Sequence, residues 1–231
     1  MVIIGHVVIY LFICPMKHIA LAIILLMLGC KCQAQEFGST ILQNSPFKNT
    51  FNSSSVEDAI SELSSIYKVE DGKVTFTIIV DSLPLSSSEI LDYAKEYLEE
   101  VYQHSKYEIV HLNTEKSLVI GSGEFFNFEQ YAIFPNQYSF TCKHFLRIDT
   151  KEGRARLCVY ADEYDIRRTN GNIYEQKDVK ITDVAPLNPD NGKAEKMYKK
   201  AFLAFAKLVV YTLYELRDEL KSKQETKVEE W

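Results

Sequence analysis

The stretch from Asp71 to Tyr102 constrains the fold of this chain most, because it holds a clear strand, a clear helix and the turn between them. The segment VTFTIIVD, residues 74–81, places a large apolar side chain at every second position. A period of two is typical of a strand with one buried face, and β-branched and aromatic residues suit such a strand. Pro84 ends the strand, so a new element begins soon after it.

A helix is predicted directly after this strand. Ser86 and Glu89 have the spacing of a capping box, in which each side chain accepts a hydrogen bond from the backbone N–H of the other residue. Leu85 and Ile90 occupy the positions of a hydrophobic staple, which fixes the angle at which the chain enters the helix. Apolar residues then recur at helical spacing and predict one buried face, made of Ile90, Ala94, Tyr97, Leu98 and Val101.

A β-hairpin is predicted at residues 138–149 and 156–166, with Glu152 and Gly153 as its central turn residues. This turn sets a register that pairs opposite charges and aromatic rings across the strands: Asp149 with Arg156, Lys143 with Asp162, and Phe145 with Tyr160. The other face of the hairpin is predicted to be core, and it carries Phe140, Cys142, His144, Leu146, Ile148, Leu157, Val159 and Ala161.

The remaining segments complete an α+β chain around a core domain at residues 71–166. We expect a linker and a short helix at 36–70, with Ser54 and Glu57 as the capping box of that helix. A hairpin should follow at 107–113 and 118–128, and a connection at 129–137. Residues 167–192 are predicted to be a loop excursion with an edge strand at 179–184, followed by a long helix at 193–222 and a charged tail at 223–231. The order β-α-β-β-β-β-α predicts a two-layer α+β fold, with helices packed on one face of an antiparallel sheet.

The first 29 residues are almost wholly apolar and allow two interpretations. The whole run could be a membrane anchor, or a signal peptide could occupy residues 1–35 with its true start at Met16. We favour the signal peptide, because Lys17 and His18 form a basic region before the apolar residues 19–28. That apolar stretch is shorter than the roughly 20 residues that a membrane-spanning helix needs.

Two processing sites overlap at the end of this segment. Residues 32–34 (Cys-Gln-Ala) resemble a signal-peptidase site, whereas Leu28, Gly29 and Cys30 resemble a bacterial lipoprotein site at which Cys30 would be acylated. Both alternatives stay open. Either one predicts an exported protein, in the periplasm or anchored as a lipoprotein in a bacterial cell envelope.

The charge of the chain argues against nucleic acid as a partner. The formal net charge is −6, and the sequence contains no concentrated basic patch of the kind that phosphate backbones require. We therefore expect no nucleic-acid partner, and membrane contact only through the signal peptide or a lipid anchor.

Cysteine and histidine residues offer one candidate metal site. Cys142 and His144 lie on one predicted strand face and His111 lies on another strand, so together they could hold a transition metal. The local spacing of a zinc motif is absent, so we expect core residues and no metal or other cofactor. Cys142 and Cys158 point to opposite faces in the predicted register, which favours free thiols over a disulfide.

Acidic residues offer a candidate catalytic site. Asp162, Glu163 and Asp165 gather near a strand end, close to Tyr160 and Tyr164, and paired carboxylates can perform acid–base chemistry or bind calcium. Carboxylates at the end of a strand are more often plain surface. No serine or cysteine nucleophile has a recognisable base and orienting partner. Enzyme activity therefore stays uncertain, and we favour a protein without it.

The second face of the hairpin is a candidate partner surface. It carries Phe145, Arg147, Cys158 and Tyr160, and aromatic residues together with arginine are enriched at interfaces. These residues face solvent or a partner if helices cover only one side of the sheet. Alternatively, the C-terminal helix or residues 166–192 cover them.

Three segments resemble a bacterial envelope family of unknown function that is described as having a TBP-like fold. They are VTFTIIVD, the helix start SSSEIL, and LVIGSGEF after a hairpin turn, and the resemblance extends over residues 73–164. It implies the fold alone, because the family has no assigned catalytic or binding residues and a shared fold does not imply DNA binding.

Two hypotheses of function follow. The first is a non-enzymatic exported module that binds an unknown protein or envelope component through an open sheet face, with Phe145, Arg147 and Tyr160 at the contact. The alternative is an envelope hydrolase that uses the acidic cluster near Asp162.

Overall fold

The computed structural model describes residues 41–52, 55–102, 108–188 and 194–229. The chain divides into two units, Met1–Asn44 and Ser45–Trp231, and the elements below belong to the second. The predicted signal peptide at 1–35 and the candidate lipidation site Cys30 lie outside the described residues. None of the helices in the described part of the chain is both long and apolar enough to cross a lipid bilayer.

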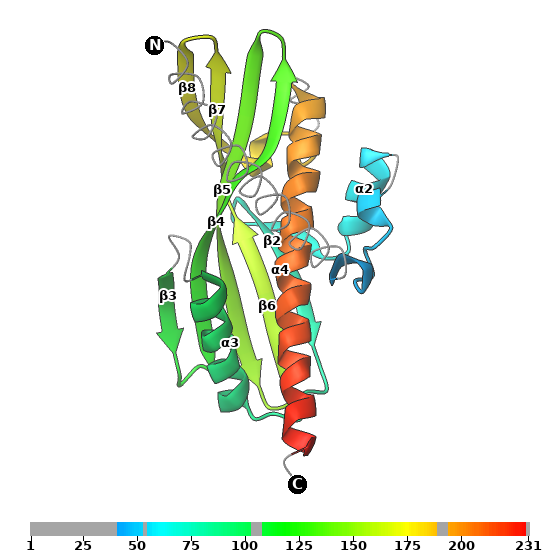
Figure 1. Ribbon diagram of the computed structural model, residues 1–231, viewed down its shortest axis with the longest axis vertical. Coiled ribbons are helices and arrows are strands. Elements are labelled where there is room, and N and C mark those ends of the chain that lie inside the picture. The colour runs from blue at the N-terminus through cyan, green and yellow to red at the C-terminus, as the bar shows by residue number, and fades with distance from the viewer. Residues whose placement is uncertain (1–40, 53–54, 103–107, 189–193, 230–231) are drawn as a thin grey trace, which may run out of the picture. The chain divides into compact units, whose positions relative to one another are not determined.

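Within the described residues, eight strands form one antiparallel sheet (Figure 1). Its main path runs β1, β2, β6, β5, β4, β3, while β7 pairs with β5 and β8 pairs with β7. The strands are β1 Tyr67–Glu70, β2 Lys73–Val80, β3 Glu108–Asn113, β4 Leu118–Ile133, β5 Asn136–Lys151, β6 Arg154–Ala161, β7 Glu163–Asn170 and β8 Ile173–Lys180.

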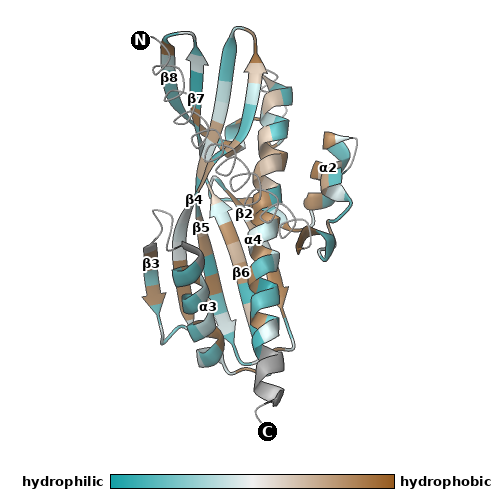
Figure 2. Cartoon of the chain, viewed as in Figure 1, coloured by the Kyte–Doolittle hydropathy of each residue, from teal (hydrophilic) through white to brown (hydrophobic). Residues whose placement is uncertain are grey.

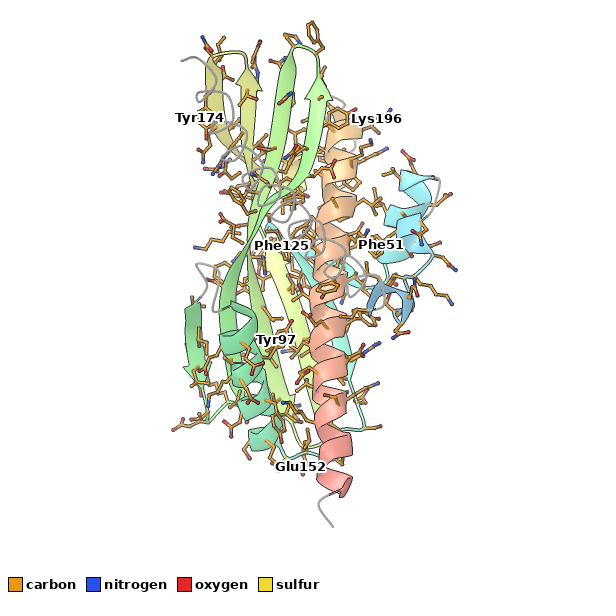
Figure 3. The ribbon with its side chains drawn as sticks, in the orientation of Figure 1. Phe51, Tyr97, Phe125, Glu152, Tyr174 and Lys196 are labelled. Atoms are coloured by element: carbon orange, nitrogen blue, oxygen red, sulfur yellow. The ribbon has the colours of Figure 1, made fainter. Side chains whose placement is uncertain are left out.

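Helices α3 and α4 cover one face of the sheet, which confirms the predicted two-layer α+β fold (Figure 1). The described helices are η1 Thr50–Asn52, α2 Val56–Leu63, α3 Ser87–Tyr102, η2 Ile181–Asp183 and α4 Glu195–Glu229. The two large helices also contact each other, because the Tyr97 hydroxyl donates to Oε2 of Glu215 at 2.8 Å (Tyr97 is labelled in Figure 3).

The predicted strand and helix at residues 71–102 are confirmed. Val74, Phe76 and Val80 on β2 are buried, as the period of two requires. The capping box is present in both directions: the Ser86 N–H donates to Oε2 of Glu89 at 2.8 Å, and the Glu89 N–H donates to Oγ of Ser86 at 3.3 Å. The staple residues and the described part of the predicted helix face are also buried, namely Leu85, Ile90, Ala94, Tyr97 and Leu98.

The core lies between the sheet and α4. All eight side chains predicted for the core face of the β5–β6 hairpin are buried. Phe205 of α4 packs its ring against those of Phe76, Phe125 and Tyr164, with centroid distances of 5.9, 6.0 and 6.2 Å. These contacts attach the C-terminal helix to three different strands, so α4 holds the sheet together.

The predicted register of the β5–β6 hairpin is confirmed over most of its length. Asp149 pairs with Arg156 and Phe145 pairs with Tyr160, while Glu152 and Gly153 form the turn. The predicted pair of Lys143 with Asp162 is wrong. β6 ends at Ala161, and β5 then changes its partner to β7, beginning with Thr141 opposite Asp165.

The predicted loop excursion at 167–192 is wrong, because β7 and β8 form a hairpin across much of it. The predicted edge strand at 179–184 is also wrong, since β8 ends at Lys180 and η2 follows. β8 contains no buried residue, and Figure 2 shows it mostly in the hydrophilic colour. A strand without a buried face lacks the alternation on which a sequence-based prediction depends.

Four element boundaries also differ from the prediction. Residues 129–137 are mainly strand, because β4 continues to Ile133 and β5 begins at Asn136. The linker region contains β1, and Ser55 caps α2, because its Oγ accepts from the Asp58 N–H at 3.2 Å. The predicted cap residue Ser54 lies outside the described residues. α4 continues to Glu229 through the predicted tail, where Lys223 pairs with Glu219 at 3.3 Å and with Glu96 at 3.7 Å.

Candidate functional site

The sheet has an outer face, which we define as the face opposite α3 and α4. It carries Phe145, Arg147 and Tyr160, because the alternating residues on the same strands point into the core. α4 packs on the core side, and β7 and β8 extend the sheet beside β5. In the part of the chain that the structure describes, neither the C-terminal helix nor the segment 166–192, the two covers considered from the sequence, lies over this face.

A hollow of about 570 Å³ opens on the outer face. Strands β2, β5 and β6 form its floor, and the connection from α2 to β1 forms a wall beside it. The Thr77 N–H donates to the Ile66 carbonyl at 2.9 Å, which fixes this wall along β2. The lining residues are Ser64, Ser65, Ile66, Tyr67, Lys68, Glu70, Thr75, Thr77, Arg147, Arg156, Cys158 and Tyr160.

Two arginines of the hollow share one carboxylate. Arg147 donates from Nε to Oδ2 of Asp149 at 3.0 Å and from Nη2 to Oδ1 at 2.7 Å. Arg156 donates from Nε and Nη2 to Oδ2 of Asp149, at 3.1 and 3.0 Å. Partial burial raises the pKa of Asp149, but the hydrogen bonds from both arginines outweigh burial and the net shift is downward. The carboxylate therefore stays ionised at neutral pH and orients both guanidinium groups.

An aromatic pair lies beside the arginines. The rings of Phe145 and Tyr160 stack with a centroid distance of 5.1 Å and an interplanar angle of 16°. The ammonium of Lys73 lies 5.3 Å from the Tyr160 centroid, and that of Lys143 lies 5.9 Å from the Phe145 centroid. Burial raises the pKa of Tyr160, so its phenol keeps a proton that it can donate at neutral pH. The outer face thus combines flat apolar surface with positive charge.

Both described cysteines are free and buried, as predicted. Cys158 lies opposite Arg147 in the ladder, and its Sγ accepts from Oγ1 of Thr77 at 3.4 Å. Cys142 is on the core side and donates to the Glu163 carbonyl at 3.4 Å. Burial raises the pKa of both thiols, so neither is an activated nucleophile at neutral pH.

The residues of the candidate metal site lie on opposite faces of the sheet. Cys142 and His144 are buried in the core, where the His144 ring stacks on Phe125 at 3.9 Å. His111 is exposed and pairs with Ile120, which in turn pairs with Arg147 of the outer face. The sheet therefore separates the three side chains. Within the described residues, no group of three or more His, Cys, Asp and Glu side chains could hold a metal ion.

The acidic cluster lies where β6 gives way to β7. Asp162 and Glu163 are exposed, whereas Asp165 is half-buried and accepts from Nε2 of Gln176 at 2.8 Å. Tyr164 is fully buried, and burial raises its pKa well above the ordinary value. None of these four residues lines the hollow on the outer face.

The sequence located part of this site. It placed Phe145, Arg147 and Tyr160 on one face of the sheet, and the structure does the same. It missed the contribution of Ser64–Tyr67, because that wall approaches β2 only in the folded chain. It also treated Arg156 as a simple partner of Asp149, although Arg156 lines the hollow.

Solved structures similar to this chain include the two that follow, whereas no protein-family model and no curated protein matches it. One is a TBP-like protein from Parabacteroides distasonis ATCC 8503, with 17% identity and a TM-score of 0.48 over 65% of this chain and 96% of that chain. The other is a DUF4468 family protein from Bacteroides ovatus ATCC 8483, with 19% identity and a TM-score of 0.43 over 66% of this chain and 91% of that chain. The first of these proteins is described as TBP-like, the same fold name that the resemblance in the sequence uses.

Proposed function

We propose that this chain is a non-enzymatic binding module that is exported and holds a protein or another envelope component on its outer face. The observation that carries the proposal is the hollow, which brings Arg147, Arg156 and Tyr160 together, with the Tyr160 ring stacked on that of Phe145. Tyrosine and arginine are the residues that most often dominate binding energy at interfaces. Export to the periplasm or to a lipid-anchored position is part of the same proposal and follows from the N-terminal sequence.

The geometry supports binding because the contact groups are held before a partner arrives. Asp149 fixes the two guanidinium groups, and the stack fixes the Tyr160 ring. A surface that is ordered in the free protein loses less conformational entropy on association, and more of the contact energy then appears as affinity.

Hydrolysis by the acidic cluster is the weaker alternative. Asp165 already accepts a hydrogen bond from Gln176 and lies 3.9 Å from a guanidinium nitrogen of Arg167. Asp162 and Glu163 are exposed at the surface, outside the hollow. These carboxylates therefore have the environment of surface residues in a sheet.

Cross-linking capture from native envelopes tests the proposal with the full chain as bait. We would compare the natural chain with Tyr160→Asp, which places a charge at the hollow, and with Tyr174→Asp, the same substitution at an exposed position on β8. Thermal unfolding would first show that both variants fold.

We expect the natural chain and Tyr174→Asp to capture the same partners, through cross-links that map to the lining of the hollow. Tyr160→Asp should lose these partners. A folded Tyr160→Asp variant that keeps every partner would overturn the outer face as the binding surface. If none of the baits captures a protein, the claim that the chain has a stable envelope partner is overturned.

A further inference from the structure

The charge balance of the hollow is the reverse of that of the whole chain. The chain carries a net charge of −6, yet Lys68, Arg147 and Arg156 line the hollow together with a single acidic residue, Glu70. Lys73 adds a further positive charge nearby, over the Tyr160 ring. These residues are scattered along the sequence, so only the fold collects them. A local excess of positive charge in an acidic protein favours negatively charged ligands at that point.

The arginines keep donors for a ligand after they have bound Asp149. Each guanidinium has five N–H donors, and the bonds to Asp149 use the Nε and Nη2 atoms of Arg147 and Arg156. None of the bonds described for these two groups uses Nη1. Two guanidinium charges also share one carboxylate, so the three groups together retain one positive charge.

Hydroxyl groups on the floor add neutral donors beside this charge. Thr75 pairs with Tyr160 across β2 and β6, so the two side chains lie next to each other on the outer face. Arg147 lies on the same face, two residues along β5 from the partner of Tyr160, and pairs with Cys158. An anion that sits over this floor would meet guanidinium, phenol and hydroxyl donors together. Oxygen anions bind best where several directed donors converge.

We infer that the hollow binds an anionic group, a carboxylate or a phosphate, with Arg147 and Arg156 as its charged donors. The inference rests on the proposed function and names the ligand chemistry of the same surface. The planar fork of arginine matches both groups in geometry, which a lysine does not achieve. The group can belong to a small molecule or to an acidic segment of a protein, and the volume of about 570 Å³ lies in the size range of ligand sites.

Calorimetric titration of the full chain tests this inference with two probes, inorganic phosphate and a hexaglutamate peptide. The test variant is Arg156→Gln, which removes a charge from the hollow and leaves Arg147 on Asp149. The matched control is Arg154→Gln on the same strand, because Arg154 pairs with Asp81 outside the hollow and its side chain is 50% exposed against 52% for Arg156.

Arg156→Gln should weaken binding at least tenfold, since a hydrogen bond to a charged group is worth roughly that factor or more, and Arg154→Gln should change it less than about twofold. Tighter binding of the peptide assigns the anion to an acidic protein segment, and tighter binding of phosphate assigns it to a small ligand. Equal affinities in the two variants, or no binding of either probe to the natural chain, would overturn the inference.

The same variants separate this inference from the proposed function. If Tyr160→Asp loses captured partners while Arg156→Gln keeps both its partners and its affinity for the probes, the binding surface stands and the anion inference fails. If the affinity for the probes depends on Arg156 but no protein is captured from envelopes, the anion site is supported and the claim of a stable envelope partner is contradicted.

Discussion

Strands β6 and β8 have the same length, eight residues, and each pairs antiparallel with its neighbours, but they differ in what lies against them. Leu157 and Val159 of β6 are fully buried under the helical layer. β8 has no buried side chain and is held by its backbone ladder and by exposed polar pairs with β7. A strand can therefore be part of one continuous sheet without sharing its core.

The two regions should contribute unequally to stability. Full burial of a large apolar side chain is worth about 1.5–3 kcal/mol, whereas an exposed ion pair is worth about 0–1 kcal/mol. β8 depends mostly on the second kind of contact, whereas β7 also buries Tyr164 and Ile166. We expect β8 to open locally at a lower free energy than the sheet beneath α3 and α4.

The largest expected effect comes from comparing the same substitution at a fully buried phenylalanine and at an exposed one. Phe205→Ala should lower the free energy of unfolding by about 3–5 kcal/mol, because Phe205 is fully buried and packs against several rings. Phe134→Ala should change it by less than about 0.5 kcal/mol, because Phe134 is 98% exposed at the β4–β5 turn. Urea unfolding of the full chain measures both, and comparable losses would contradict the contrast.

A pH titration tests the core region alone. Burial lowers the pKa of His144 to about 4, against a smaller opposing effect of a backbone hydrogen bond at Cys142. Between pH 6.5 and 4 the unfolded chain takes up a proton on this histidine that the folded chain excludes. Stability should therefore fall as the pH decreases through this window, by up to roughly 3 kcal/mol.

The measurement is the free energy of unfolding at a series of pH values for the natural chain and for His144→Gln. Groups that titrate in both proteins cancel in the difference between the two profiles. The natural chain should lose more stability than the variant on acidification from pH 7 to pH 4.5. Parallel profiles would mean that His144 takes up its proton equally in the folded and the unfolded protein.

The same contrast explains which parts of the fold were predictable from sequence. β2 and β6 were found because their alternation reports a buried face, and Glu152 and Gly153 then set the register of β5 against β6. β8 was missed because its side chains are exposed. Residues 167–192 were predicted to be a loop, although Gly171 and Asn172 form a two-residue hairpin connection from β7 to β8.

The candidate site was predictable only to the extent that it lies on one hairpin. Phe145, Arg147 and Tyr160 share a face through the local register, so their association follows from sequence. The wall at Ser64–Tyr67 approaches β2 through tertiary contacts, which periodicity does not encode. Local rules thus located the floor of the hollow, and long-range packing closes its side.

Alanine substitutions at two glycines should have smaller effects on stability. A Cβ at Gly121 would lie 2.7 Å from Cδ2 of the buried Leu98, so Gly121→Ala should cost about 1–3 kcal/mol through overpacking. The cost should shrink in a Leu98→Ala background, which removes the clash. Gly171 in the β7–β8 turn has φ of +56° and open space around its Cβ position, so Gly171→Ala should cost about 1 kcal/mol from backbone strain alone.

Double-mutant cycles by urea unfolding measure these couplings. Gly121 and Leu98 should show a clear interaction energy, while Gly171 and Leu98 should be additive. An equal cost of Gly121→Ala in both backgrounds would mean that Leu98 already adapts, and that the core tolerates an added methyl group there.

The smallest expected effect lies in the cross-strand ion pairs. Arg168 of β7 and Glu175 of β8 face each other at 3.1 Å, and their side chains are 37% and 58% exposed, so a cycle of Arg168→Gln and Glu175→Gln should give a coupling of about 0.2–1 kcal/mol. The pair of Arg156 and Asp149 should give a larger coupling, because Asp149 is only 23% exposed and less screened by solvent. Salt should weaken the Arg168 pair more than the Arg156 pair. A stronger coupling between β7 and β8 would show that exposed polar pairs hold β8 more tightly than its lack of buried side chains implies.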